Sequence, residues 1–599
     1  AQVVKQQVLS RGFHPQMVAG AAAQERHPPI QQGADCGNGE SFGALHKGDD
    51  VEVFFRFEHT KVIQGSASAG RSEPCFPVHS PAAALQAPRI AITDGWLPAT
   101  VEKDYLPTSS KDAAEKDCTA DQIHVRLRHP LWGNRNGDML SVNDGDSIPC
   151  LKMRLQDVRR SGKTPPTRLS FVCLRWGIWS PYHDREGSVG GWGEFGTCIC
   201  DKYIKGLFET VYARLGPEYE VLTCFVHQSS DVRSLNAASL AAQLKSSRLG
   251  MRTAAMYFLW PVAWLDGHAG ELSTDDLAGY IEGDALFGLM NALEACGIPT
   301  RHPHPSHLYR TLTSKAWSAD LCLSAEFHVP ATTRVNRALG LQDPTAAARK
   351  AVAALRVLIE EQQGLDRAGT VLAAASGPLR GVAKLGFAWE AREVYHFSGE
   401  HELADRLRKL LHQPGSTAEV VLVQRYIPHD CEIRVYCLHG RPVKMLYTRF
   451  GDVNEDGSPA GFQALERGAA VSQWFDGQEK GLKVAEDMIM KRLLQRWIRW
   501  LRTQSCELPS AIRLDFFVKV HENGTADVHI GELTEQGAST LAWKDGARRT
   551  FEAILDSCLG ETGVDAALDG VSDGLQIERP QSPGPMKKRP CLGSGAATQ

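Results

Sequence analysis

Residues 511–535 read AIRLDFFVKVHENGTADVHIGELTE, two runs with a β-strand pattern around an Asn-Gly pair. An Asn-Gly pair between such runs is a strong signal for a hairpin with a two-residue turn. That turn places Glu522 opposite Thr525, and the same register then places Asp515 opposite Glu532. Because side chains alternate between the two faces of a strand, we expect both carboxylates on one face of the hairpin.

Two directly opposed carboxylates repel each other, and a divalent ion between them removes that repulsion. Their oxygen atoms are the hard ligands that Mg²⁺ prefers. In the same register Arg513 lies opposite Thr534 on the same face, where its guanidinium would suit a phosphate or a developing anion. The alternative interpretation of this spacing is a solvated hairpin whose charges simply face water.

The two strands together resemble the metal-binding end of ATP-grasp enzymes, through Arg513-Leu-Asp515-Phe-Phe and Gly531-Glu532-Leu-Thr534. In that family an Asp and a Glu on neighbouring strands bind Mg-ATP, and a third ligand, often Asn, stands two positions after the Glu. The resemblance therefore implies Asp515, Glu532 and Thr534 as metal ligands, with Thr534 departing from the usual Asn. It implies ATP and Mg²⁺ as cofactors, with Mn²⁺ as an alternative ion.

Two upstream lysines stand in the order that the family uses. Ser314-Lys315-Ala-Trp, followed by His328-Val-Pro330, resembles the lysine segment that precedes a P-x-T strand, and Gly381-Val-Ala-Lys384 resembles the lysine of the small lid subdomain. The resemblance implies that Lys315 and Lys384 bind phosphate from opposite sides of a cleft. Taken alone, each lysine is an ordinary solvated residue.

Residues 420–427 (VVLVQRYI) resemble the hinge strand that lines the adenine, which implies Gln424, Tyr426 and Ile427 near the base. Glu432 and Arg434 follow, and alternation puts both on one face. By the same resemblance Glu432 would hold the ribose hydroxyls and Arg434 a phosphate.

The family implies a reaction in which a carboxylate attacks the γ-phosphate of ATP and an amine or similar nucleophile then displaces phosphate from the acylphosphate. Arg434 and Arg513 would be the catalytic cations, and the substrates would be small-molecule or peptide carboxylates and amines. No P-loop motif G-x-x-x-x-G-K-[ST] occurs in the chain. The competing hypothesis is a non-catalytic nucleotide-binding protein, or a recognition or scaffold protein.

Residues 45–162 contain short alternating strands at 50–57, 96–102 and 122–128 and end in Asp-Val-Arg. This pattern resembles a Tudor or SH3-like β-barrel. Related barrels bind methylated lysine or arginine in aromatic cages, so the resemblance implies a methylated peptide as a ligand of this module. The rings on offer are those of Phe55, Trp96, Tyr105 and Trp132. The alternative is that Phe55 and Trp96 are core residues.

The elements that must position the site alternate between strand and helix from about residue 168, which favours an α/β layer with a parallel sheet. The predicted strands span 169–176, 220–227 and 254–265, and the predicted helices span 203–214, 235–249, 286–296 and 345–363. Residues 380–450 and 511–535 are interpreted as hairpins, with a Trp-rich helix at 478–503 between them.

The predicted fold class is therefore α/β and α+β. It comprises an ATP-grasp fold, with an α/β subdomain ahead of two α+β subdomains that clasp ATP, preceded by a small SH3-like barrel. The predicted parts are listed here: disordered 1–44, barrel 45–162, α/β subdomain 168–335, lid and metal-binding subdomains 336–565, and a disordered tail 566–599.

The bulk composition is that of soluble globular domains, with 43% hydrophobic and 23% charged residues. A net charge of −4 gives no signal for nucleic acid, and no apolar run is long enough to span a membrane. Scattered cysteines and a basic run at 587–589 predict an intracellular protein, cytoplasmic or nuclear. The first residue is Ala, which leaves open a natural N-terminus, and a targeting peptide, further upstream.

His302, His304 and His307 have the spacing H-x-H-x-x-H. Interleaved prolines and the lack of a nearby carboxylate favour a loop over a metal site.

Overall fold

The computed structural model describes most of the chain between residues 45 and 561. The residues outside the description within that span are 57–61, 64–88, 104–121, 128–130, 134–138, 142–149, 161–166, 177–198, 227, 246–251, 260–280, 367–378, 387–393, 413–419, 451–461, 506, 535–542 and 544. The predicted disordered segments 1–44 and 566–599, Tyr105 and the basic run at 587–589 lie outside the described residues, and nothing of the side chains of Phe55 and Trp132 is described.

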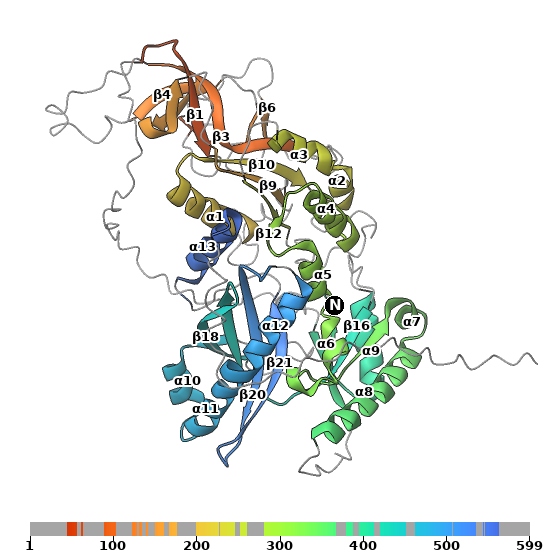
Figure 1. The fold of residues 1–599 in the computed structure, drawn as a ribbon. Helices are drawn as coiled ribbons and strands as arrows, with labels where there is room; N and C mark the ends of the chain where they lie inside the picture. Colours follow the sequence, from red (N-terminus) through yellow and green to blue (C-terminus); the bar gives the residue numbers. More distant parts are fainter. Residues whose placement is uncertain are drawn as a thin grey trace, which may run out of the picture. The chain divides into compact units, whose positions relative to one another are not determined.

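Ten strands from the N-terminal half of the chain form one mixed sheet (Figure 1). Four parallel strands stand at one end in the order β12, β11, β9, β10, which confirms the predicted α/β layer. The strands of this sheet are β1 (Asp50–Arg56), β2 (Val62–Ile63), β3 (Arg89–Val101), β4 (Gln122–Leu127), β7 (Cys150–Arg154), β8 (Val158–Arg160), β9 (Leu169–Trp176), β10 (Tyr219–Val226), β11 (Arg252–Phe258) and β12 (Thr300–His302). A separate pair is formed by β5 (Leu131–Gly133) and β6 (Met139–Ser141).

Helices pack against the parallel strands because these strands are hydrophobic on both faces. The helices of this region are α1 (Ile199–Leu215), α2 (Ser229–Ser234), α3 (Ala237–Lys245), α4 (Gly283–Ala295) and the C-terminal α13 (Gly546–Leu559), after the 3₁₀ turn η2 (Leu155–Asp157). Helix α13 contributes Phe551, Ile554 and Leu555 to the same core, so the end of the described chain returns to this region.

Strand β3 joins the N-terminal strands to the parallel strands. Its first half pairs with β10, and its second half pairs with β1 and β4. The region predicted as a barrel has a small core of its own, yet it shares a continuous sheet with the α/β region. A Tudor or SH3-like barrel remains a prediction.

The two regions also share aromatic packing. Phe54 of β1 lies 5.7 Å from Trp96, 6.1 Å from Tyr212 and 5.2 Å from Tyr219, measured between ring centroids. The indole N–H of Trp96 donates to the Pro217 carbonyl at 2.9 Å, and the Arg159 guanidinium lies 4.5 Å from the Trp96 ring centroid. Trp96 therefore packs against the α/β region, as the core alternative proposed, and one face of its ring is already covered.

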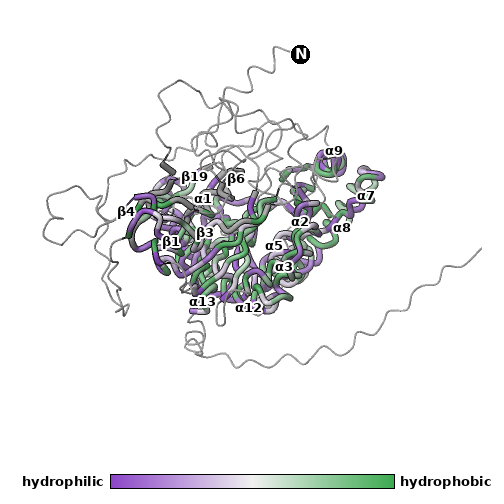
Figure 2. The backbone as a smooth tube through the Cα atoms, turned by 90° about the horizontal axis from the view of Figure 1, so that it is seen from above, coloured by the Kyte–Doolittle hydropathy of each residue, from purple (hydrophilic) through white to green (hydrophobic). Residues whose placement is uncertain are grey.

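A second sheet has four strands in the order β13, β16, β14, β15. We call it the lid sheet. Its strands are β13 (Thr332–Asn336), β14 (Arg380–Leu385), β15 (Val394–Ser398) and β16 (Val420–Arg425), and its helices are α7 (Arg337–Gln342), α8 (Pro344–Asp366) and α9 (Gly399–Leu411). These helices alternate between hydrophilic and hydrophobic residues along their length (Figure 2). Strand β13 pairs with β16, although the sequence assigned it to the α/β region.

Helix α9 corrects the interpretation of residues 380–450 as hairpins alone. Leu403, Leu407, Leu410 and Leu411 are buried on one side of this helix, spaced as a helix requires. Within residues 380–450 the strands do form antiparallel pairs on either side of this helix, β14 with β15 and β17 with β18.

A third sheet has five antiparallel strands in the order β19, β18, β17, β20, β21. They are β17 (Cys431–Leu438), β18 (Arg441–Phe450), β19 (Phe462–Leu465), β20 (Ala511–Val520) and β21 (Ala526–Thr534). One face packs against α10 (Arg467–Trp474), α11 (Glu479–Met488), the π-helical turn η7 (Ile489–Leu493) and α12 (Leu494–Gln504), which confirms the predicted Trp-rich helix. Helices α5 (Ser306–Ser314) and α6 (Trp317–Leu321) and the 3₁₀ turn η6 (Ala325–Phe327) precede the lid sheet.

The turn between β20 and β21 is longer than predicted. The backbone N–H of His521 donates to Thr525 at 3.0 Å, and that of Gly524 donates to His521 at 2.9 Å. Residues 522–524 therefore form the loop, and Glu522 does not pair with Thr525. Gly524 has φ +80°, the left-handed conformation that closes three-residue loops of this kind.

A β-bulge further along the hairpin compensates for the longer turn. Phe516 pairs with Ile530, whereas Asp515, one residue earlier, pairs with Glu532. Gly531 is thus the extra residue on β21. Beyond the bulge the predicted register is restored.

No helix in the described part of the chain is long and apolar enough to cross a membrane.

We expect Phe54→Ala to destabilise the N-terminal strands and the α/β region together. Phe54 is 1% exposed, and truncating a buried Phe costs about 3–5 kcal/mol through lost burial and the cavity that remains. Chemical unfolding followed by circular dichroism measures this loss. Ile90→Ala is the control, because Ile90 lies on β3 but is 37% exposed. Equal effects of the two substitutions would contradict a shared core.

Candidate functional site

Three rows of side chains cross the face of the five-stranded sheet that is opposite α11 and α12, and we call this face the site face. They arise because the register aligns alternate residues of β17, β20 and β21. The rows are Glu432–Phe517–His529, Arg434–Asp515–Glu532 and Tyr436–Arg513–Thr534. The predicted pairs Asp515–Glu532 and Arg513–Thr534 are confirmed as cross-strand neighbours.

Asp515 is held by two arginines. Arg513 donates to both of its carboxylate oxygens, with Nε and Nη2 each at 2.8 Å, and Arg434 Nε lies 3.8 Å from Oδ2. Asp515 is 3% exposed and Arg513 5% exposed. A buried charge at this depth requires such pairing.

Glu432 and Arg434 form the neighbouring pair on β17. Arg434 Nη2 donates to Glu432 Oε2 at 2.8 Å, and Arg434 Nε donates to the Thr448 hydroxyl at 3.0 Å. Thr448 lies opposite Glu432 on β18 and is fully buried. The predicted placement of Glu432 and Arg434 on one face is confirmed.

Lys315 connects the segment after α5 to the five-stranded sheet. Its ammonium lies 2.6 Å from Glu532 Oε1, and only 5% of the residue is exposed. Burial alone would raise the pKa of the Glu532 carboxyl, but the charges of Lys315 and Arg513 lower it well below the ordinary value. Glu532 therefore stays ionised.

The two predicted lysines come from segments that touch. A Cβ atom added to Gly386, just after β14, would lie 2.9 Å from the backbone carbonyl oxygen of Ser314. Only glycine allows this approach between the Lys384 strand and the Lys315 turn.

Lys384 donates to Gln424 Oε1 at 3.1 Å. Gln424 Nε2 in turn donates to the Thr332 hydroxyl at 2.9 Å. Burial lowers the pKa of the Lys384 ammonium to about 8, with the positive charge of Lys315 acting in the same direction.

Thr534 ends the third row. Its residue is 8% exposed, and no described residue hydrogen-bonds its buried hydroxyl. No cluster of three His, Cys, Asp or Glu side chains that could hold a metal ion occurs among the described residues. Asp515 and Glu532, with the Thr534 hydroxyl nearby, still fit Mg²⁺, which uses one or two carboxylates and completes its shell with phosphate oxygens and water.

The structure brings together Arg434, Arg513, Asp515, Glu532 and Lys315 by direct contacts, and Lys384 with Gln424 beside them. Two other predicted residues lie elsewhere at the end of the lid sheet. The Tyr426 ring has the Arg380 guanidinium 4.7 Å from its centroid and the His396 ring 5.3 Å away, and Ile427 is 9% exposed. Their predicted place beside adenine remains a prediction.

Sequence reasoning missed Thr448 and the role of Thr332 as a hydrogen-bond partner. A Pro-x-Thr pattern marked Thr332, but nothing local marked Thr448. Both are buried threonines that orient a charged or amide side chain on a neighbouring strand.

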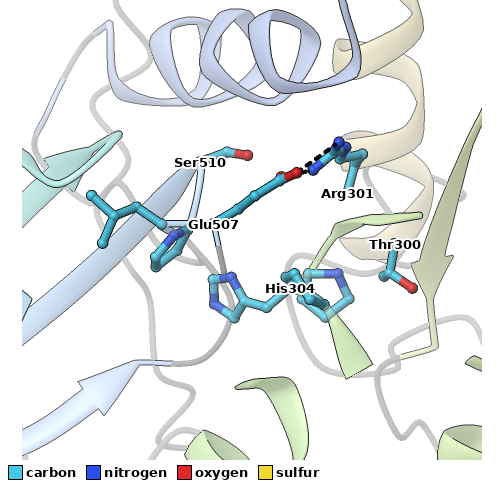
Figure 3. Close-up of a pocket in the computed structure, with 9 residues that line it drawn as sticks. Thr300, Arg301, His304, Glu507 and Ser510 are labelled. Carbon is cyan, nitrogen blue, oxygen red and sulfur yellow. Dashed lines mark hydrogen bonds and ion pairs between the residues drawn. The ribbon is translucent and has the colours of Figure 1, made fainter. Parts of the chain in front are cut away.

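A separate pocket lies beside β12 and the loop before β20 (Figure 3). Its lining includes His304 and the ion pair of Arg301 with Glu507. Burial lowers the pKa of the neighbouring His302 to about 3, so this imidazole is neutral. The pocket contains none of the predicted site residues. The loop interpretation of the three histidines is right only for His304, because His302 ends β12 and His307 lies in the first turn of α5.

No family model matches the chain, and neither does any curated protein. Among solved structures, it is similar to D-alanine–D-alanine ligase from Bacillus anthracis (12% identity, 66% of this chain and 98% of that chain, TM-score 0.36). It is also similar to the D-cycloserine synthetase DcsG (15%, 65% and 99%, TM-score 0.37) and to the ATP-grasp ligase PsnB in complex with minimal precursor, Mg and ADP (15%, 65% and 98%, TM-score 0.31).

Lys384 generates a testable pH dependence. At a pH near 8, the pKa of this ammonium, about half of the free protein carries a neutral Lys384. A bound phosphate favours the charged form, so Mg-ATP binding should take up about half a proton, and the uptake should fade at lower pH. Calorimetric titrations in two buffers of different ionisation enthalpy measure it.

Lys384→Met should abolish this proton uptake. Lys519→Met is the matched control and should retain it, because Lys519 lies on β20 of the five-stranded sheet, has a side chain that is 41% exposed and pairs with Asp430. Equal uptake in both variants would mean that Lys384 does not contact phosphate.

Proposed function

We propose that the chain is an ATP-grasp ligase, which uses Mg-ATP to join a carboxylate to an amine or similar nucleophile through an acylphosphate. The observation that carries this proposal is the row Arg434–Asp515–Glu532 with Lys315 at its end. The two opposed carboxylates can hold a metal ion, and the cations around them outnumber them. This combination suits a polyphosphate that is bound together with its metal.

In this proposal Asp515 and Glu532 hold Mg²⁺, or Mn²⁺ in its place, with Thr534 as the third candidate ligand. When bound, the ion neutralises charge on the β- and γ-phosphates. Lys315 and Lys384 bind phosphate oxygens from the two segments that meet at Gly386. The lid sheet and the five-stranded sheet would then be the two parts that clasp ATP.

Glu432 would accept hydrogen bonds from the ribose, and Tyr426 and Ile427 would line the base. Gln424 was expected beside adenine, but its amide hydrogen-bonds Lys384 and Thr332. The adenine set and the ribose contact come from the family resemblance.

The chemistry assigned to this chain has two steps. An oxygen of the substrate carboxylate attacks the γ-phosphorus, the bond from that phosphorus to the β–γ bridging oxygen breaks, and ADP leaves. The amine then attacks the acyl carbon, phosphate leaves with its bonding electrons, and the nitrogen loses a proton. Arg513 and Arg434 are rigidly held guanidiniums beside the metal carboxylates, placed to stabilise the anion that develops in each step.

A non-catalytic nucleotide-binding or scaffold protein is the second candidate. It is favoured by one observation: both metal carboxylates already have cationic partners, Asp515 in Arg513 and Glu532 in Lys315. Binding of a methylated peptide by the N-terminal strands belongs to this candidate, as a recognition function.

The direct test incubates the protein with Mg-ATP and a pool of amino acids and small carboxylic acids. We expect ADP and phosphate to be released only with a particular acid and amine. Asp515→Asn and Glu532→Gln should each lower the rate by on the order of 100-fold, because each removes a group that organises the phosphates.

Asp527→Asn is the matched control, since Asp527 lies on the same hairpin with a side chain that is 63% exposed. AMP and pyrophosphate as products would rule out the acylphosphate route. Tight ATP binding without turnover in any pool would favour the second candidate.

A further inference from the structure

We infer that Gln424 positions Lys384 for phosphate binding and does not itself read the adenine base. This inference rests on the proposed nucleotide site, but not on the ligase reaction. It replaces the role that resemblance gave to Gln424.

A chain of three hydrogen bonds carries the inference. The Thr332 hydroxyl donates to the Pro330 carbonyl oxygen at 2.7 Å, Gln424 Nε2 donates to the Thr332 hydroxyl oxygen at 2.9 Å, and Lys384 Nζ donates to Gln424 Oε1 at 3.1 Å. The groups come from neighbouring strands, because β13 and β14 flank β16 in the lid sheet.

The direction of this chain is fixed by chemistry. A hydroxyl has one proton, and Thr332 gives it to the Pro330 carbonyl, so its oxygen can only accept from Gln424. The amide must therefore present its NH₂ group to Thr332 and its carbonyl to Lys384. A lysine ammonium only donates, so the carbonyl is the end it requires.

Burial separates Gln424 from any ligand. Gln424 is 4% exposed and Thr332 is 1% exposed, and both ends of the amide already have partners. Lys384 is more accessible than either and spends one of its three donors on the amide. The amide holds the Lys384 ammonium in one orientation, and its other two donors can then contact an anion.

The arrangement also explains how a lysine can be held in an apolar sheet. Burial lowers the pKa of the Lys384 ammonium, and the positive charge of Lys315 lowers it further. The Gln424 carbonyl supplies a neutral acceptor that orients the ammonium.

The test measures binding of two probes, Mg-ATP and Mg-tripolyphosphate, to the full chain by calorimetry. Gln424→Leu should weaken both probes by about 10-fold or more, the loss expected for a hydrogen bond to a charged group. A residue that reads the base would affect Mg-ATP alone.

Thr332→Val supplies a milder break of the same chain, which keeps the test valid if Gln424→Leu does not fold. It should weaken both probes in the same direction, and Thr332→Ser, which keeps the hydroxyl, should restore them. A purely structural role for Thr332 would give a stability loss without a change in affinity.

A double-substitution cycle provides the decisive readout. In a Lys384→Met background, Gln424→Leu should have no further effect on either probe. Additive effects, or a loss confined to Mg-ATP, would overturn the inference while leaving the proposed function intact. Failure of the wild type to bind either probe would overturn both, whereas binding without ligase turnover would overturn only the proposed reaction.

Discussion

Pairing of buried charge on the site face is the constraint around which the rest of this region is built. Asp515, Arg513 and Arg434 are each less than one-tenth exposed, and a charge at that depth is costly unless a partner of opposite sign contacts it. Alternation along β20 and β17 supplies those partners two residues away, Arg513 for Asp515 and Glu432 for Arg434. The cross-strand register adds the contact of Arg434 with Asp515 at 3.8 Å. The opposite face is left free for the apolar contacts with α11 and α12 that hold the sheet.

That constraint extends to the lid sheet through Lys315. The ion pair of Lys315 with Glu532 joins a turn after α5 to the edge strand β21, and Gly386 brings β14 against the same turn. At the bulge the fit is equally close, since a Cβ on Gly531 would lie 2.8 Å from the ring of Phe517. At Gly386 the neighbour is backbone and cannot move aside, so glycine is required there, whereas at Gly531 a Cβ would displace the Phe517 ring.

How much of this could be predicted from the sequence depends on how local each feature is. The pairing of Asp515 with Glu532 was predicted correctly, although two features of the hairpin were not predicted. The loop has three residues and not two, which shifts the register by one residue, and the bulge at Gly531 shifts it back. The periodic leucines of α9 were legible and were overlooked. Thr448, by contrast, becomes a site residue only because β18 pairs with β17, and no local pattern contains that information.

The ion pairs of the site decide whether its carboxylates can exchange a cationic side chain for a metal ion. Glu532 is neutralised by Lys315 and Asp515 by Arg513, so each carboxylate has a partner of opposite sign. A metal ion would take over the neutralisation of these carboxylates, and the polyphosphate that arrives with it would occupy Lys315 and the arginines. Both carboxylates would have a partner of opposite sign before and after the exchange. Under the proposed function, the exchange would therefore replace one set of ion pairs by another and would leave neither carboxylate buried without a counter-charge.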